Sequence, residues 1–167
     1  NGWTVGASGS ILKTTNGGIT WNSYNTNLTD YELVCVQFIN RQIGYTAGKS
    51  NNNKGAVAKT TNGGINWTIC INSLKKPITS LYMINTSKGF VSSINNDTIA
   101  QTNDGWNSLE YKKAGNGQWI NKIFFIDSLQ GWLLGNPGFV SKTTNGGLDW
   151  QVYNVSLGNT VNMYFIN

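Results

Sequence analysis

Residues Thr143–Trp150 read Thr-Thr-Asn-Gly-Gly-Leu-Asp-Trp, and this octapeptide decides the fold because the chain repeats it. Thr14–Trp21 and Thr60–Trp67 are close copies, and Gln101–Trp106 is a degenerate one. The asparagines that we align across the four copies are Asn16, Asn62, Asn103 and Asn145. They are separated by 46, 41 and 42 residues. A fixed period of about 40–45 residues is typical of propellers and solenoids.

The residue types of the octapeptide indicate a tight turn between two strands. An asparagine side chain can accept backbone N–H bonds within a turn, and the two glycines permit positive φ. The threonine suits a strand end, and the tryptophan can pack between sheets. A calcium loop is the alternative, but it would need carboxylates where three copies have neutral asparagine. We assign a structural role to Thr14, Asn16, Gly18, Trp21, Thr60, Asn62, Gly64, Trp67, Asn103, Gly105, Thr143, Asn145, Gly147 and Trp150.

The rest of each repeat predicts four short antiparallel strands. A glycine–aromatic pair opens one strand in every repeat, at Gly2-Trp3, Gly44-Tyr45, Gly89-Phe90 and Gly131-Trp132. The most apolar strands, which we expect to be innermost, are Leu33–Asn40, Ile78–Asn85, Ile120–Asp127 and Val161–Asn167. No segment shows a sustained helical rhythm. Four strands in about 42 residues predict an all-β fold, a β-propeller of four-stranded antiparallel blades.

The repeat register predicts one domain over residues 1–167. Its repeats are approximately 1–32, 33–77, 78–119 and 120–160, with 161–167 as the inner strand that completes the first blade. Sixteen strands counted in this way make four blades, and a closing last strand would remove the free sheet edges. Two arrangements remain open: a closed four-bladed ring, or four blades of a larger propeller.

The formal net charge of +5 comes from eleven lysines and Arg41 against seven carboxylates. The basic residues form no long run, so we expect no nucleic-acid partner. Cys35 and Cys70 fall on the first and last strands of one blade, about 14 Å apart, which is too far for a disulfide. We interpret them as small apolar residues. No apolar run is long enough to span a membrane.

The octapeptide resembles the Asp-box, or bacterial neuraminidase repeat, whose pattern is Ser/Thr-x-Asp-x-Gly-x-Thr-Trp. The wider unit, from Gly-Trp-x-x-Gly to the octapeptide, resembles the photosystem II stability/assembly-factor-like propellers and their bacterial extracellular relatives. The resemblance implies a propeller, an extracytoplasmic (secreted or cell-surface) location, and a box at the blade periphery, away from the ligand face. This chain has Asn where the family has Asp, and its third copy lacks the final Trp.

Catalytic residues are scarce. The chain has no histidine, which excludes a Ser-His-Asp triad and a histidine metal site. Sialidases with this repeat use three arginines, whereas this chain has Arg41 alone. A glycosidase needs two carboxylates, but Asp30 and Glu32 come from one short loop, and Asp127 aligns with asparagines and is read as a turn former. We therefore expect no enzymatic activity, cofactor or metal.

A ligand would bind at the loops that lead into the inner strands. Trp119 and Glu32 align at the same position before these strands, and Tyr31 and two lysine pairs lie close to it. An aromatic platform with amide and ammonium donors suits a glycan or an acidic peptide. Two plainer interpretations are that Trp119 is core between blades and that the lysines are simply solvated. The rim candidates are Tyr31, Glu32, Lys75, Lys76, Lys112, Lys113 and Trp119.

These features together predict a non-catalytic binding or scaffolding module of a secreted or surface protein. It would engage a protein or glycan through one propeller face. The alternatives are a piece of an Asp-box glycoside hydrolase and a purely structural repeat of a surface or matrix assembly.

Overall fold

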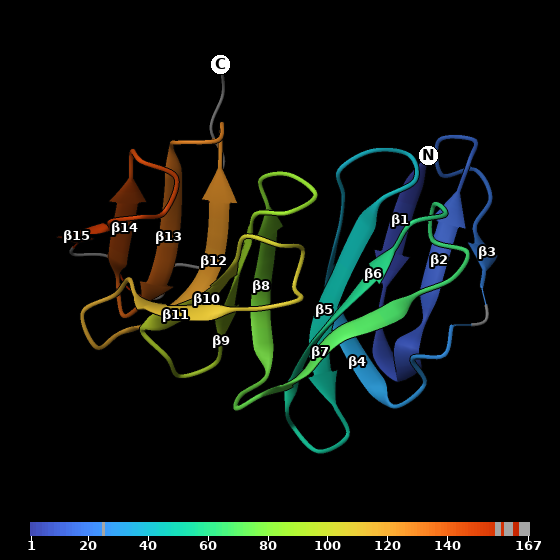
Figure 1. The fold of residues 1–167 in the computed structure, drawn as a ribbon, viewed down its shortest axis with the longest axis horizontal. Coiled ribbons are helices and arrows are strands. Elements are labelled where there is room, and N and C mark those ends of the chain that lie inside the picture. Colours follow the sequence, from blue (N-terminus) through green and yellow to red (C-terminus); the bar gives the residue numbers. More distant parts are fainter. Residues whose placement is uncertain (25, 156–157, 159–161, 164–167) are drawn as a thin grey trace. The chain divides into compact units, whose positions relative to one another are not determined.

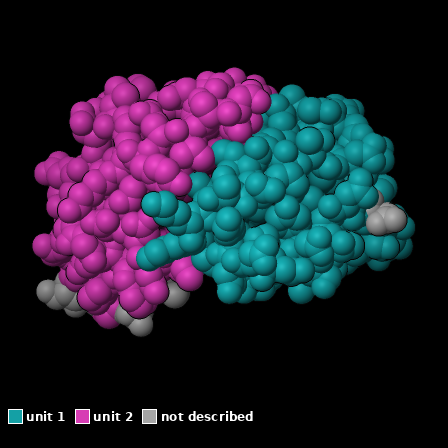
Figure 2. All heavy atoms as spheres, turned by 60° about the horizontal axis from the view of Figure 1, so that its bottom comes forward, with its two compact units in different colours: residues 1–78 teal, residues 79–167 magenta. Residues whose placement is uncertain are grey.

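The computed structural model describes residues 1–24, 26–155, 158 and 162–163. This part of the chain contains fifteen strands and one short 3-10 turn, η1 (Ala7–Gly9) (Figure 1). The chain divides into two compact units, residues 1–78 and 79–167, coloured separately in Figure 2. Each unit is described by itself below. None of the helices in the described residues is long and apolar enough to cross a membrane.

Unit 1 contains two antiparallel sheets. The first has three strands, β1 (Gly2–Val5), β2 (Ile11–Thr14) and β3 (Asn22–Ser23). The second has four strands, β4 (Tyr31–Phe38), β5 (Gly44–Ser50), β6 (Gly55–Thr60) and β7 (Thr68–Leu74). In both sheets each strand pairs with the next one along the chain, so both are meanders.

Unit 2 contains two four-stranded sheets of the same meander topology. One consists of β8 (Ile78–Met83), which starts at the unit boundary, β9 (Gly89–Ser93), β10 (Thr98–Thr102) and β11 (Glu110–Lys113). The other consists of β12 (Trp119–Phe125), β13 (Gly131–Asn136), β14 (Phe139–Thr143) and β15 (Gln151–Asn154). These sheets confirm the predicted all-β fold with four strands per repeat. The predicted last strand, 161–167, lies outside the described residues.

Apolar side chains that alternate along the strands form a core in each unit. In unit 2 the rings of Phe90 and Phe125 stack with centroids 5.1 Å apart, and Trp150 meets both rings edge-on. In unit 1 Trp67 meets the ring of Phe38 edge-on at 6.0 Å. Offset and edge-on contacts between aromatic rings are favourable beyond the area that they bury. The end of each inner strand is therefore held by the tryptophan of the repeated motif.

The repeated turn has the structure that its residue types predicted. The Gly64 amide donates to Thr60 Oγ1 at 3.0 Å, and the Asn66 amide donates to Asn62 Oδ1 at 2.9 Å. Gly64 has a φ of +88°, which a side chain would strain. The first and last copies make the same bonds through their own threonine and asparagine. These three copies therefore fold into the same hydrogen-bonded turn.

The third copy was aligned wrongly by one residue. Thr102 Oγ1 accepts from the Trp106 amide at 2.9 Å, and Asp104 Oδ1 accepts from the Ser108 amide at 2.9 Å. Asp104, not Asn103, therefore takes the place of the asparagine, and Gly105 matches the first glycine of the pair. The corrected steps from Asn62 to Asp104 and from Asp104 to Asn145 are 42 and 41 residues.

Trp106 stands in the place of the second glycine, so the third copy has moved its tryptophan rather than lost it. Its φ is +74°, in the left-handed region. The side chain is fully buried, and its indole N–H points to the sulfur of Met83 at 3.1 Å. Met83 ends the inner strand β8 as Phe38 ends β4. The displaced tryptophan thus meets the end of its inner strand, as Trp67 and Trp150 do.

Asp127 is the turn former that its alignment with asparagines predicted. Its Oδ1 accepts from the amides of Leu129 at 2.7 Å and Gln130 at 2.6 Å. These bonds, that from Gln130 foremost, hold the pKa of Asp127 below its ordinary value. Cys35 on β4 and Cys70 on β7 lie on opposite edges of one sheet and are not joined by a disulfide.

Candidate functional site

All seven rim candidates lie at one end of their sheets, the end where the inner strand begins. Tyr31 and Glu32 open β4, and Trp119 opens β12. The lysine pairs stand at the ends of the outer strands, with Lys75 and Lys76 just after β7 and Lys112 and Lys113 on β11. In a four-stranded meander the first strand begins where the fourth one ends. Four candidates belong to unit 1 and three to unit 2.

The four candidates of unit 1 do not form one cluster. Glu32 makes an ion pair with Lys49 at 3.0 Å, and Tyr31 is half-buried against the core. Lys75 and Lys76 are exposed at the other edge of the sheet, three strand spacings or about 14 Å from β4. A ligand at this end would meet separate groups rather than a formed site.

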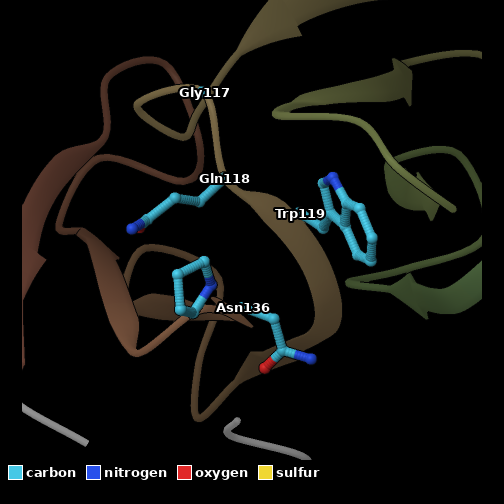
Figure 3. A pocket seen from close by; sticks show the side chains of 5 residues that line it. Gly117, Gln118, Trp119 and Asn136 are labelled. Atoms are coloured by element: carbon cyan, nitrogen blue, oxygen red, sulfur yellow. The ribbon is translucent and has the colours of Figure 1, made fainter. Parts of the chain in front are cut away.

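Trp119 belongs to a pocket of about 360 Å³ in unit 2. The pocket, here called the Trp119 pocket, is lined by Gly117, Gln118, Trp119, Asn136 and Pro137. The Trp119 side chain is 50% exposed, so it is not a buried core residue. Figure 3 shows Gln118 and Trp119 pointing to opposite sides of the chain, with Asn136 beside them. The register of β12 and β13 sets Trp119 directly opposite Asn136.

A single carboxylate organises the loop that precedes Trp119. Asp97 Oδ2 accepts from the Gly117 amide at 2.9 Å and lies 3.6 Å from the ammonium of Lys113. The backbone oxygen of Asp97 accepts from the amides of Ala114 and Gly115 at 3.0 and 2.9 Å. Asp97 therefore holds the loop in a defined shape and keeps the exposed Lys113 near the pocket-lining Gly117.

The backbone at Trp119 also depends on a close approach between two strands. A Cβ at Gly135 on β13 would overlap the backbone oxygen of Trp119. The pairing of β12 with β13 shifts by one residue between Ile120 and Lys122. Glycine at this position lets the two backbones approach, as glycine does beside bulges. The backbone of Trp119 is thus closely packed against β13, while its ring remains exposed.

The pocket offers groups for recognition. A tryptophan ring provides apolar contact area, and the Gln118 and Asn136 amides can both donate and accept hydrogen bonds. Gln118 Oε1 is buried and has no hydrogen-bond partner among the described residues. The nearby Lys113 is largely exposed and adds positive charge.

The carboxylates of the chain are engaged by other groups of the fold. Asp104 accepts from the Ser108 hydroxyl and amide and from Thr102, and these bonds lower its pKa from 3.8 to about 2. A general acid would need the opposite shift. The remaining partners are Asn51 for Asp30, Lys49 for Glu32, Gly117 for Asp97, Gln101 for Glu110, Gln130 for Asp127 and Asn145 for Asp149. Among the described residues, His, Cys, Asp and Glu side chains form no group of three that could hold a metal.

Of the five residues that line the pocket, only Trp119 was a rim candidate from the sequence. Asn136 could have been found, because an antiparallel register places the end of one strand opposite the start of its neighbour. Asp97, which shapes the loop, was counted as an acidic residue but not connected with Trp119. Gly117 and Gln118 belong to the polar, glycine-rich loop that precedes Trp119, whereas Pro137 gave no signal that points to a site.

The fold that carries the Trp119 pocket is similar to that of several solved structures. No family model and no curated protein matches the sequence. YCF48 from Cyanidioschyzon merolae is 16% identical with a TM-score of 0.64, and the match covers 90% of this chain and 55% of that one. YCF48 bound to D1 peptide is 18% identical with a TM-score of 0.61, over 74% of this chain and 41% of that one. An ancestral GH74 enzyme is 18% identical with a TM-score of 0.71, over 89% of this chain and 22% of that one.

These similarities establish the fold as a β-propeller. They confirm the predicted fold class and agree with the resemblance to Asp-box and photosystem II assembly-factor-like propellers. The chain spans about half the length of YCF48 and about a fifth of the GH74 enzyme. At these low identities the shared property is the fold.

Proposed function

We propose that this chain is a non-catalytic binding module that holds an acidic segment of a partner protein at the Trp119 pocket. The observation that carries the proposal is the half-exposed Trp119 ring beside a pocket of about 360 Å³ with two side-chain amides. Tryptophan is enriched among the residues that dominate protein interfaces, because it contributes a large rigid surface. An exposed tryptophan on an ordered strand is therefore a suitable anchor for a partner side chain.

The charge of the surroundings favours an acidic segment. Lys112 and Lys113 end the strand β11, and Lys113 stands near Gly117 through their shared partner Asp97. The whole chain has a net charge of +5, which attracts acidic partners over a distance. A polypeptide partner is also in keeping with the solved structure of YCF48 bound to D1 peptide, a protein of the same fold.

The engaged carboxylates support a module without catalysis. Glycoside hydrolysis needs one carboxyl group with a raised pKa and a second one across the scissile bond. In this chain the shifts resolved for carboxyl groups, at Asp104 and Asp127, are both downward. The likeness to GH74 enzymes is therefore taken as a likeness of fold. We also propose an extracytoplasmic location, because the repeat resembles that of Asp-box propellers and their bacterial extracellular relatives.

A peptide-display selection tests the proposed function. The purified 167-residue chain is the bait, and the Trp119→Ala variant is used to remove peptides that bind elsewhere. We expect enrichment of peptides that combine Asp or Glu with an apolar side chain. Their affinity should fall about tenfold or more in Trp119→Ala, equivalent to at least about 1.4 kcal/mol.

A glycan array probed with the same two proteins tests the alternative that the pocket binds a carbohydrate. Glycan binding that Trp119→Ala abolishes, with no enriched peptide, would replace the protein partner by a carbohydrate. If a folded chain binds neither class, the proposal is wrong and a purely structural role is the better account. Circular dichroism and the urea midpoint of both proteins control for loss of folding.

A further inference from the structure

The backbone on both sides of Trp119 is held by one turn of the neighbouring sheet. This turn, residues 94–97, joins β9 to β10. Asp97 Oδ2 accepts from the Gly117 amide at 2.9 Å, and the backbone oxygen of Asn96 accepts from the Ile120 amide at 3.1 Å. Two adjacent residues of the turn therefore fix the chain just before and just after Trp119.

The two bonds differ in how general they are. Leu33, the counterpart of Ile120 on β4, donates its amide to the backbone oxygen of Gly6 at 3.0 Å, so the bond at Ile120 belongs to the fold. The turn between β1 and β2, residues 6–10, contains no carboxylate, whereas the turn before β10 ends in Asp97. The Asp97 carboxylate is thus a feature of the loop that leads to Trp119 rather than of every repeat.

Of the two contacts that the Asp97 carboxylate makes with this loop, the hydrogen bond from Gly117 is the stronger. The Asp97 side chain is only 20% exposed, and a hydrogen bond to a charged acceptor is stronger than one between neutral groups. Lys113, its partner at 3.6 Å, has a side chain that is 71% exposed. Ion pairs to such exposed lysines contribute little. Asp97 therefore acts on the loop mainly as a hydrogen-bond acceptor.

We propose that Asp97 is a positioning residue of the Trp119 pocket, which raises the affinity for the partner by ordering the loop before the partner binds. This inference rests on the proposed function. A loop that is already ordered loses less conformational entropy on binding, so its affinity is higher. Gly117 has a φ of +92° and no side chain that could anchor it, so the backbone at this point depends on the bond to Asp97 for its order.

The test compares the affinity of one acidic peptide, taken from the display selection, for four proteins. They are the unaltered chain, Asp97→Ala, Asp97→Asn and Asp30→Ala. Asparagine keeps an oxygen that can accept from the Gly117 amide but loses the charge. Asp30 is the matched control, because it is a carboxylate that contacts a loop residue, Asn51, at 3.4 Å and belongs to unit 1.

A second measurement needs no ligand. Hydrogen exchange of the Gly117 amide, followed by NMR in the unaltered chain and the two Asp97 variants, reports directly on the order of the loop. The urea midpoint of each protein shows that it is folded under the conditions of the assay.

We expect Asp97→Ala to weaken peptide binding about tenfold or more and to speed exchange at Gly117 by a similar factor, as the loss of a hydrogen bond to a charged acceptor should do. Asp97→Asn should bind at least as tightly as the unaltered chain, because it keeps the acceptor and removes a negative charge near an acidic ligand. Asp30→Ala should bind as the unaltered chain does.

Unchanged affinity in Asp97→Ala would overturn the proposal. Equal losses in Asp97→Ala and Asp97→Asn would also overturn it, because the charge and not the acceptor would then be the cause. A loss of the same size in Asp30→Ala would show a general effect of removing a carboxylate and would contradict a role at this site. If no peptide binds the unaltered chain, the proposed function itself is wrong, whereas faster exchange at Gly117 in Asp97→Ala would still show that Asp97 orders the loop.

Discussion

At the scale of single residues, the threonine that opens each motif holds the turn by accepting backbone hydrogen bonds in a buried position. Thr60 is 1% exposed, and its Oγ1 accepts from the amides of Gly64 and Asn62. Replacing it with alanine leaves the buried Gly64 amide without its partner, which costs about 1–3 kcal/mol. We therefore expect Thr60→Ala to lower the free energy of unfolding by this amount in urea titrations.

Thr61 provides the matched control, because it is the same residue type one position later and its side chain is exposed. Thr61→Ala should change the free energy of unfolding by less than about 0.5 kcal/mol. Equal losses in the two variants would show that the hydroxyl of Thr60 does not hold the turn.

Asp104 makes stability depend on acid pH. Hydrogen bonds from the Ser108 hydroxyl and amide, and then from Thr102, lower the pKa of Asp104 from 3.8 to about 2. A carboxyl whose pKa is depressed in the folded state stabilises that state above its unfolded pKa, and this contribution disappears as the pH falls through the folded pKa. Between pH 4 and pH 2 the unaltered chain should therefore lose more stability than Asp104→Asn, which does not titrate. Urea midpoints across this range measure the difference, and parallel curves would contradict it.

At the scale of structural elements, Trp106 combines an unfavourable left-handed backbone conformation with a stabilising, buried side chain. Its left-handed φ of +74° costs about 1–2 kcal/mol. Its fully buried side chain would leave a cavity on removal, at a cost of about 3–5 kcal/mol. Burial is the larger effect, so Trp106→Gly should destabilise the protein although glycine suits the backbone. A glycine variant with a higher urea midpoint would reverse this order of effects.

The strands and turns could be predicted from the sequence because each repeat presents the same signals. Trp67 and its counterparts follow the same glycine pair, and the apolar inner strands recur at the same interval. The error at Asn103 arose because Thr102-Asn103-Asp104 permits two alignments, and the bonds from the Trp106 amide to Thr102 and from the Ser108 amide to Asp104 decide between them.

The Trp119 pocket was harder to predict from the sequence than the strands and turns. A tryptophan that opens a strand is compatible with a buried and with an exposed side chain, so the exposure of Trp119 could not be read from the sequence. The partners that shape its surroundings, Asn136 and Asp97, lie 17 and 22 residues away along the chain. Asn136 meets Trp119 through the strand register, and Asp97 meets the loop through the bonds that it accepts from the Ala114, Gly115 and Gly117 amides.

At the scale of the whole molecule, eleven lysines and one arginine outweigh seven carboxylates and give the chain a net charge of +5. Acidic peptides should therefore associate faster and bind more tightly at low ionic strength. We expect their dissociation constants to rise about tenfold between 50 mM and 500 mM salt, measured by anisotropy. Affinity that is independent of salt would show that the lysines near the Trp119 pocket do not take part.

The measurement that tests the central claim most directly is the affinity of one selected acidic peptide for three proteins: the unaltered chain, Trp119→Ala and Tyr111→Ala. Tyr111 is a suitable control because it is an aromatic residue of the same unit, 56% exposed, and does not line the pocket. The account predicts that Trp119→Ala weakens binding about tenfold or more, whereas Tyr111→Ala leaves it unchanged. Equal affinities for the unaltered chain and Trp119→Ala would contradict the account, because the peptide would then bind outside the Trp119 pocket.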